Sequence, residues 1–219
     1  MGILGILLCF VPLAAAFLIF TFGYKIQFTH QLLATLFGLV AIFPISVIQY
    51  FVPNIPNGII SPLVYSLIKS LIVYGLVEEL VKMALLWPLP HKETLNFLLL
   101  SFVLGLSLAC FESVVYFFDH LQIANNRGAQ LLYGQIALRI FTSDIIHMTC
   151  TGLCGLFVYT CRQKKARTSF FITAILLHGI YDFFAGYQNG LRWFSIAVVL
   201  MAIAECRIKY VSLKNVEKE

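Results

Sequence analysis

Charged residues are scarce in this sequence, at 11% of the 219 residues, whereas hydrophobic residues make up 60%. The mean hydropathy is +0.90. This composition excludes an ordinary soluble domain and indicates an integral membrane protein. The sequence also lacks a basic patch interleaved with aromatic residues, so we expect no nucleic-acid partner. We interpret the net charge of +5 mostly as a signal of membrane topology.

Polar residues are too few to interrupt long apolar runs, and about seven runs reach the roughly 20 residues that a membrane-spanning helix needs. They lie at residues 3–22, 32–52, 63–88, 95–118, 131–160, 169–187 and 191–207. No Lys or Arg precedes the first run, so we expect a permanent span there rather than a signal peptide. The prediction is an all-α polytopic membrane helix bundle of about seven transmembrane helices. Residues 1–219 are predicted to form a single integral membrane domain.

The Lys and Arg residues are unevenly distributed among the loops. Most of them fall in the segment 162–167 and in the tail 207–218. Because cytoplasmic loops carry an excess of Lys and Arg, we predict an outside N-terminus and a cytoplasmic C-terminus. Because the chain is predicted to span the membrane, the lipid bilayer is its first expected partner.

The apolar runs between residues 63 and 187 contain ionisable side chains, which cost at least about 2.5–3.5 kcal/mol each near a bilayer centre. We therefore predict that residues 63–187 form a catalytic four-helix core. In the first of these runs, Glu78 and Lys82 are four residues apart and share a helix face. Glu79 is rotated from Glu78 by about 100°. An ionised Glu beside a water is a general base, although a Glu–Lys pair can also simply fasten helices together.

The next three runs each add polar groups at helical spacing. Glu112 and Tyr116 lie one turn apart, an arrangement that a structural hydrogen bond explains as well as a catalytic one does. His147 stands in the following run, and Cys150 and Cys154 continue its face. That face suits a soft metal, but packing between helices is the simpler interpretation of the cysteines.

The last of these runs places His178 and Asp182 on one face, so the carboxylate can orient the imidazole. Gly179 between them allows another backbone to approach closely.

Several known signatures are missing. The sequence contains no His-Glu-x-x-His, Gly-x-Gly-Asp or Gly-x-Ser-x-Gly motif, which disfavours three other types of intramembrane protease. A proton-coupled transporter or channel is an alternative, because chains of Glu, Asp and His also relay protons. The internal repeats common among transporters are lacking here, however. A membrane scaffold is a third interpretation.

The ordered motifs resemble those of the PrsW family of intramembrane proteases, which is related to the prenyl-protein (CAAX-type) proteases. The resemblance rests on Glu78-Glu79-x-x-Lys82, Phe111-Glu112-x-x-x-Tyr116, His147 and His178-Gly179-x-x-Asp182, in that order. One position differs, since Thr151 stands where the family leads us to expect a Gly four residues after His147.

The resemblance implies an intramembrane endopeptidase that uses a Glu-activated water. It implies single-span membrane proteins, such as anti-sigma factors, as substrates and the bacterial cytoplasmic (inner) membrane as the location. On this basis we predict Glu78 as the general base, His147 as a water-holding residue, and His178, held by Asp182, as the oxyanion donor. Glu79 and Glu112 would tune the site, while Lys82 and Tyr116 would support the carboxylates. We expect no cofactor, although Glu and His are also ligands of a divalent metal such as zinc.

Overall fold

The computed structural model describes residues 2–52, 60–90, 93–127, 129–187 and 190–216, and within them the side chains outside residues 122–131. Every secondary-structure element in these ranges is a helix, in agreement with the all-α prediction. In chain order the elements are α1 (Gly2–Cys9), α2 (Val11–Leu18), the π-helical turn η1 (Ile19–Gly23), α3 (Phe28–Phe51), α4 (Pro62–Lys69), the π-helical segment η2 (Ser70–Leu76), α5 (Val77–Leu86), α6 (Thr94–Arg127), α7 (Ala129–Phe141), α8 (Ser143–Arg162), α9 (Thr168–Ala185), the 3₁₀ turn η3 (Gly190–Trp193) and α10 (Phe194–Val216).

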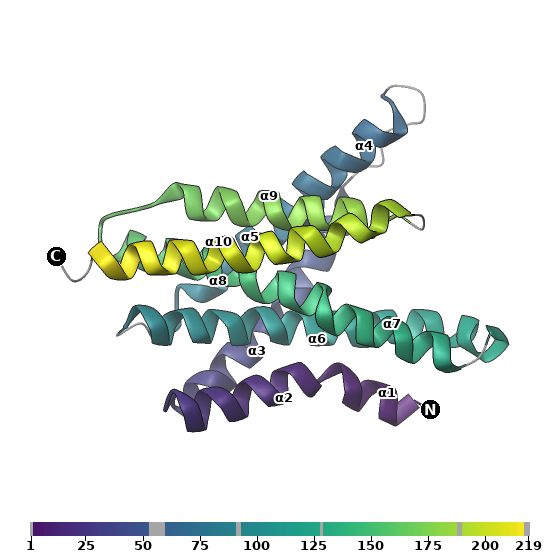
Figure 1. The fold of residues 1–219 in the computed structure, drawn as a ribbon, viewed down its shortest axis with the longest axis horizontal. Coiled ribbons are helices and arrows are strands. Elements are labelled where there is room, and N and C mark those ends of the chain that lie inside the picture. Colours follow the sequence, from purple (N-terminus) through teal and green to yellow (C-terminus); the bar gives the residue numbers. More distant parts are fainter. Residues whose placement is uncertain (1, 53–59, 91–92, 128, 188–189, 217–219) are drawn as a thin grey trace.

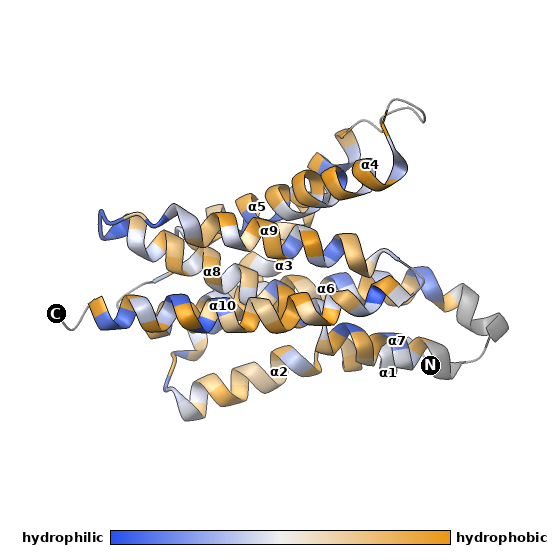
Figure 2. Cartoon of the chain, turned by 45° about the horizontal axis from the view of Figure 1, so that its top comes forward, coloured by the Kyte–Doolittle hydropathy of each residue, from blue (hydrophilic) through white to orange (hydrophobic). Residues whose placement is uncertain are grey.

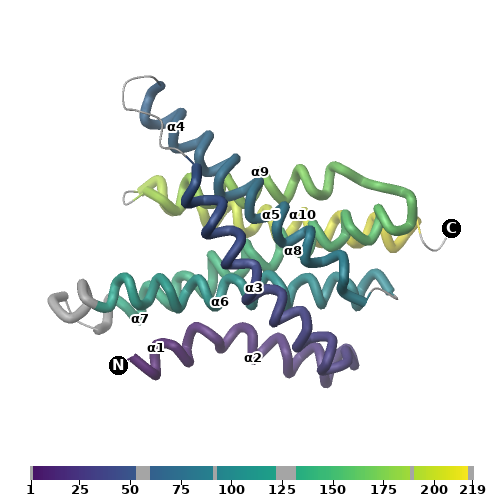
Figure 3. The backbone as a smooth tube through the Cα atoms, turned by 180° about the vertical axis from the view of Figure 1, so that it is seen from behind, coloured from purple at the N-terminus to yellow at the C-terminus, as the bar shows by residue number. Residues whose placement is uncertain are grey.

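Most of the helices run side by side along the long axis of the molecule (Figure 1). Helix α6 packs against α8 and α3, and α8 packs in turn against α9 and α10. Seen from behind, α3 crosses the other helices obliquely, and α4 projects from the bundle (Figure 3). The N- and C-termini lie at opposite ends of the bundle.

The core lies around α6 and α8, whose apolar side chains are buried against each other. Val103 and Leu104 of α6 and Leu153 of α8 are all fully buried. The outer faces are apolar as well, since Phe43 of α3 and Leu200 of α10 are 76% and 62% exposed. Hydrophobic residues, in orange, accordingly cover much of α4 and α10 in Figure 2. Apolar exposure on this scale suits a lipid environment rather than water.

Among the described residues, four helices are long and apolar enough to cross a membrane, or five when a pair bent by 42° at the N-terminus is taken as one span. The four are Phe28–Phe51, Thr94–Leu121, Leu132–Arg162 and Thr168–Ala185. The predicted run 63–88 is divided between α4, η2 and α5. These helices support an integral membrane protein, while the count of seven spans, the orientation and the four-helix catalytic core stay predictions.

The predicted run 131–160 is interrupted at Thr142, which has φ −127° and ψ −72° and separates α7 from α8. The Thr142 hydroxyl donates to the Leu138 carbonyl at 2.8 Å and accepts from the Tyr181 hydroxyl at 3.1 Å. Ser143 then begins α8. The break places Asp144 and His147 near the start of α8, although α7 and α8 together still make up the single candidate span Leu132–Arg162.

Candidate active site

Helix α5 brings the paired carboxylates into the bundle. It begins at Val77, directly after the π-helical segment η2, so Glu78 and Glu79 occupy its first turn. A π-helical segment changes the rotational register of the residues that follow it and is frequent at functional sites. Glu78, Glu79 and Lys82 are 5%, 0% and 0% exposed. The Glu-Glu-x-x-Lys motif therefore lies inside the protein.

Two glycines allow this segment to approach α9. A Cβ on Gly75 of η2 would lie 2.7 Å from the Ile175 carbonyl oxygen, and one on Gly179 of α9 would lie 2.7 Å from the Leu71 Cα. Both contacts are with backbone, which cannot move aside as a flexible side chain can. The close approach foreseen at Gly179 is thus present, and it brings α5 within reach of His178.

Glu79 is surrounded by donors. Its Oε1 lies 2.7 Å from Lys82 Nζ and 2.7 Å from His178 Nδ1. The thiol of Cys154 donates to its Oε2 at 3.2 Å. The sequence favoured the pair of Glu78 and Lys82, but that distance is 3.8 Å, so the ammonium pairs chiefly with Glu79. A buried ion pair needs such additional hydrogen bonds to offset its desolvation.

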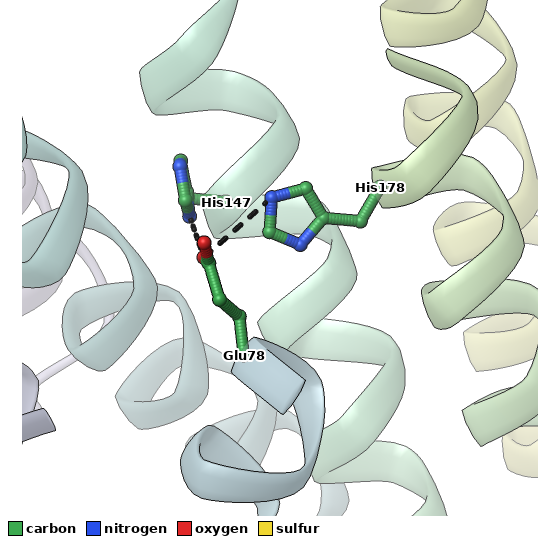
Figure 4. A group of neighbouring side chains, drawn as sticks. All are labelled: Glu78, His147 and His178. Atoms are coloured by element: carbon green, nitrogen blue, oxygen red, sulfur yellow. Dashed lines mark ion pairs between the residues drawn. The ribbon is translucent and has the colours of Figure 1, made fainter. Parts of the chain in front are cut away.

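Glu78, by contrast, faces the imidazoles of His147 and His178 (Figure 4). Its Oε2 lies 3.8 Å from His147 Nδ1 and 3.7 Å from His178 Nε2. Among the described residues this buried oxygen has no hydrogen-bond partner. Its Oε1 accepts from Gln49 Nε2 at 3.2 Å. The three side chains come from α5, α8 and α9, so the structure brings the predicted Glu78, His147 and His178 together.

The proton on His178 is placed by Glu79. A carboxylate only accepts hydrogen bonds, so the 2.7 Å contact requires that Nδ1 carry a proton. In a neutral ring Nε2 is then an acceptor that faces Glu78, with Asp182 Oδ2 3.5 Å away. Glu79 thus holds the imidazole more closely than the predicted orienter Asp182 does. An oxyanion-donor role would require a doubly protonated ring, whereas binding a water or a metal through Nε2 would not.

His147 links the buried end of the site to its open end. Its Nδ1 lies 3.1 Å from Lys82 Nζ, and its Nε2 lies 3.2 Å from Glu112 Oε2. The Thr151 hydroxyl donates to the His147 carbonyl at 2.6 Å. Across the helix contact stands Gly105 of α6, where a Cβ would lie 2.6 Å from the Thr151 hydroxyl. A glycine on α6 therefore supplies the space that the resemblance led us to expect from a glycine on the histidine helix.

Glu112 forms the open end of the site with a residue that the sequence analysis did not select. Its Oε2 lies 2.8 Å from Arg139 Nη2, and its side chain is 41% exposed. The Arg139 Nε donates to Ser113 Oγ at 2.9 Å. The Tyr116 hydroxyl lies 3.5 Å from Gln135 Oε1, and its ring packs against the Arg139 guanidinium at 4.8 Å. Tyr116 thus supports Glu112 indirectly, through Arg139.

Gln49 and Arg139 are the polar residues of the site that sequence reasoning missed. Each is a polar residue within a membrane-length, mostly apolar run, which is the signal that the sequence offers. Neither has an ionisable partner one helical turn away in its own helix, so spacing along a helix does not reveal either residue. Their partners, Glu78 and Glu112, lie on other helices.

A cavity of about 470 Å³ opens beside these groups. Four acidic residues contribute to its lining, namely Glu78, Glu112, Asp119 and Asp182. Gln49, Tyr116 and Arg139 line it as well. A peptide segment that enters this cavity would therefore contact Glu78. Glu79 and Lys82 are not among the residues that line the cavity.

The same side chains can hold a metal ion. One ligand atom from each of Glu78, His147 and His178 lies within 4.8 Å of the others, and all three residues are buried. Zinc bound to nitrogen at about 2.0–2.1 Å and to oxygen at about 2.0–2.2 Å needs ligands somewhat closer together than this. The unfilled Glu78 Oε2 and the accepting His178 Nε2 supply the required lone pairs. Glu79, bound to the second nitrogen of His178, matches the carboxylate that commonly fixes a metal-binding histidine.

The chain is similar to known proteins. A family model described as "PrsW family intramembrane metalloprotease" matches residues 27–205, a range that includes all the site residues above. The curated relative Protease PrsW of Clostridioides difficile (strain 630) is 28% identical over 157 residues, which cover 68% of this chain. The match spans 63% of that relative, less than two thirds of its length. No solved structure matches the chain.

Proposed function

The chain belongs to the PrsW family of intramembrane metalloproteases, and on that premise we propose that it is an intramembrane endopeptidase that hydrolyses peptide bonds of membrane proteins. One observation carries the proposal: Glu78 turns an unfilled carboxylate oxygen toward His147 and His178 in the middle of an apolar bundle. Burying an ionisable group in a membrane protein is costly, so its presence there points to a function. The adjoining cavity gives a peptide access to it.

In the proposed reaction Glu78 acts on a water that His147 and His178 help to position. Oε2 of Glu78 takes a proton from the water as the water oxygen bonds to the scissile carbonyl carbon. The proton then passes to the amide nitrogen as the carbon–nitrogen bond breaks, which leaves a carboxyl group and an amine. General base catalysis of this kind contributes typically about 10²–10⁴ in rate. Gln49, which donates to the other oxygen of Glu78, keeps that oxygen occupied and Oε2 directed inward.

A divalent metal is compatible with the same residues. Glu78, His147 and His178 would hold it, and a bound zinc ion would supply Lewis acidity toward the attacking water and the scissile carbonyl. Lys82 limits how the ion is held, because its ammonium lies 3.1 Å from His147 Nδ1 and would repel a cation there. The tight pairing of Lys82 with Glu79 keeps much of that charge neutralised.

We further propose single-span membrane proteins, including anti-sigma factors, as the substrate class, and the bacterial cytoplasmic membrane as the location. The apolar exterior suits lipid on all sides of the bundle. The cavity volume of about 470 Å³ accommodates a few residues of an unwound substrate rather than a whole helix.

The test is cleavage of a panel of single-span membrane proteins by the purified protein in lipid, comparing wild type with Glu78→Gln, with and without a chelator. Gln keeps the size of Glu78 and its contact with Gln49 but removes the base. We expect wild type to cleave at least one substrate and Glu78→Gln to lose about 10²–10⁴ of that rate. Full activity in Glu78→Gln would overturn the general-base assignment.

The comparison with and without a chelator distinguishes a metal-free site from a metal-bound site. Cleavage that survives the chelator and is lost in Glu78→Gln indicates a metal-free, glutamate-dependent reaction. Cleavage lost with the chelator and restored by zinc indicates that Glu78, His147 and His178 act as ligands. If no protein in the panel is cleaved, proton flux through the same vesicles tests the transporter alternative.

A further inference from the structure

A second cavity, of about 330 Å³, adjoins the first and has a different lining. Arg139 and Arg192 both contribute to its wall, and none of the described residues that line it is acidic. The first cavity, in contrast, has four acidic residues in its lining. The two cavities share Tyr116, Arg139, Tyr181 and Ala185. The two cavities are therefore neighbours, close enough for nearby residues of one bound chain to reach both.

The two arginines are not equally neutralised. Arg139 already binds Glu112 and Ser113 through Nη2 and Nε. Arg192, in the turn η3, forms no ion pair with any residue that the structure describes. The Ser195 hydroxyl donates to the Arg192 carbonyl at 2.7 Å and so fixes the turn that carries it. Among the described residues, therefore, no carboxylate forms an ion pair with Arg192 in the wall of the second cavity.

The remaining lining suits a short polar side chain with an aliphatic stem. Leu138, Ile196 and Trp193 provide apolar surface, while Gln135 adds an amide. A guanidinium is the side chain best matched to a carboxylate, which it can bind through two parallel hydrogen bonds. Glutamate or aspartate combines this carboxylate with an aliphatic stem.

We propose that the second cavity binds an acidic side chain of the substrate, Asp or Glu, within a few residues of the scissile bond, with Arg192 as the specificity-determining residue. The proposal rests on the proposed function, because it assigns the first cavity to the peptide bond under attack. A lipid phosphate has related chemistry, but a substrate side chain is favoured because this cavity shares part of its wall with the catalytic one.

The test uses a substrate that the wild-type protein cleaves and places Glu, Gln or Lys in turn at each of the positions flanking the cleavage site. At one or two positions we expect kcat/KM for Glu to exceed that for Gln by about 10-fold or more, as for a hydrogen bond to a charged group. Arg192→Ala should abolish this preference, so that within this variant kcat/KM for the Glu substrate falls to that for the Gln substrate. Arg192→Glu should reverse it in favour of Lys. A flat profile in wild type, or a Glu preference that persists in Arg192→Ala, would overturn the proposal.

A binding measurement keeps the proposal testable even if no substrate is cleaved. The chain has two Trp residues, Trp87 and Trp193, so Trp87→Phe leaves a reporter in the wall of the second cavity. In the Glu78→Gln, Trp87→Phe protein, a Glu-containing peptide should change Trp193 emission at a lower concentration than its Gln counterpart. Equal responses would overturn the proposal. So would a response that follows phosphatidylglycerol in the bilayer instead of the peptide.

Discussion

Glu78 and Glu79 are neighbours in the sequence, yet they lie in two different regions of the site. Glu79 belongs to a closed region in which Lys82, His178 and Cys154 all donate to it. Glu78 belongs to an open region that lines the cavity and keeps one oxygen without a hydrogen bond among the described residues. Hydrogen bonds to its lone pairs stabilise a buried carboxylate. A carboxylate that accepts a proton from water, in contrast, needs a lone pair that is still available. The closed region is therefore expected to govern stability, and the open region to govern turnover.

The largest effect is expected from breaking the closed region. Lys82→Met keeps the length of the side chain but removes the ammonium, which leaves Glu79 buried without its cation. Loss of one partner of a buried pair costs about 3–5 kcal/mol. We expect the free energy of unfolding in mixed micelles to fall by that amount.

A double variant checks the reason for this loss. Glu79→Gln combined with Lys82→Met removes both charges, so it should be more stable than Lys82→Met alone. If the double variant were less stable than the single one, uncompensated charge would not be the cause of the destabilisation.

A larger side chain at Gly179 should move His178 away from Glu79. In Gly179→Ala the new methyl group would lie 2.7 Å from the Leu71 Cα, so η2 and α9 must move apart. Overpacking of this kind costs about 1–3 kcal/mol. Gly134→Ala in α7 is the matched control, because nothing lies within 4 Å of its new Cβ. Equal unfolding free energies for the two variants would contradict the close contact.

A smaller effect is expected in the open region, and on activity rather than stability. Gln49→Ala removes the hydrogen bond to Glu78 Oε1. We expect kcat to fall by about 10-fold, as for the loss of a hydrogen bond to a charged group, while KM and the free energy of unfolding change little. A change in KM alone would show that Gln49 contacts substrate instead of positioning Glu78.

The smallest effect is expected at the thiol beside Glu79. Cys154→Ala removes the contact between Sγ and Glu79 Oε2. We expect cleavage to change by less than about threefold, because a thiol is a weak donor. Zinc content, measured by elemental analysis, should be unchanged. Loss of both activity and bound zinc would instead make the thiol a metal ligand.

Much of the site could be predicted from the sequence because charge in an apolar run is a strong signal. Glu78, His147 and His178 were selected in this way, and the structure brings them together. The pairing was less predictable. Spacing within a helix suggested Glu78 with Lys82 and His178 with Asp182, yet the shorter distances are those of Lys82 and His178 to Glu79.

The reason is geometric. Spacing along one helix shows which side chains share a face, but the rotation of that helix against its neighbours decides which of them touch. The π-helical segment η2 alters this rotation just before Glu78. Its sequence carries no Pro, and its single glycine, Gly75, does not by itself mark a π-helical segment. The interruption at Thr142 has no Pro or Gly signal either. Gln49 and Arg139 could be assigned to the site only from the structure, because their partners lie on other helices.

The pairing of Lys82 with Glu79 also bears on how the protein is assembled. Both residues lie in α5, three positions apart, so the ammonium finds its principal counter-ion within a single helix. Helices α8 and α9, which later cover it with His147 and His178, come much further along the chain. During biosynthesis α5 can therefore be inserted with its charge already neutralised, before the helices that complete the site have left the ribosome.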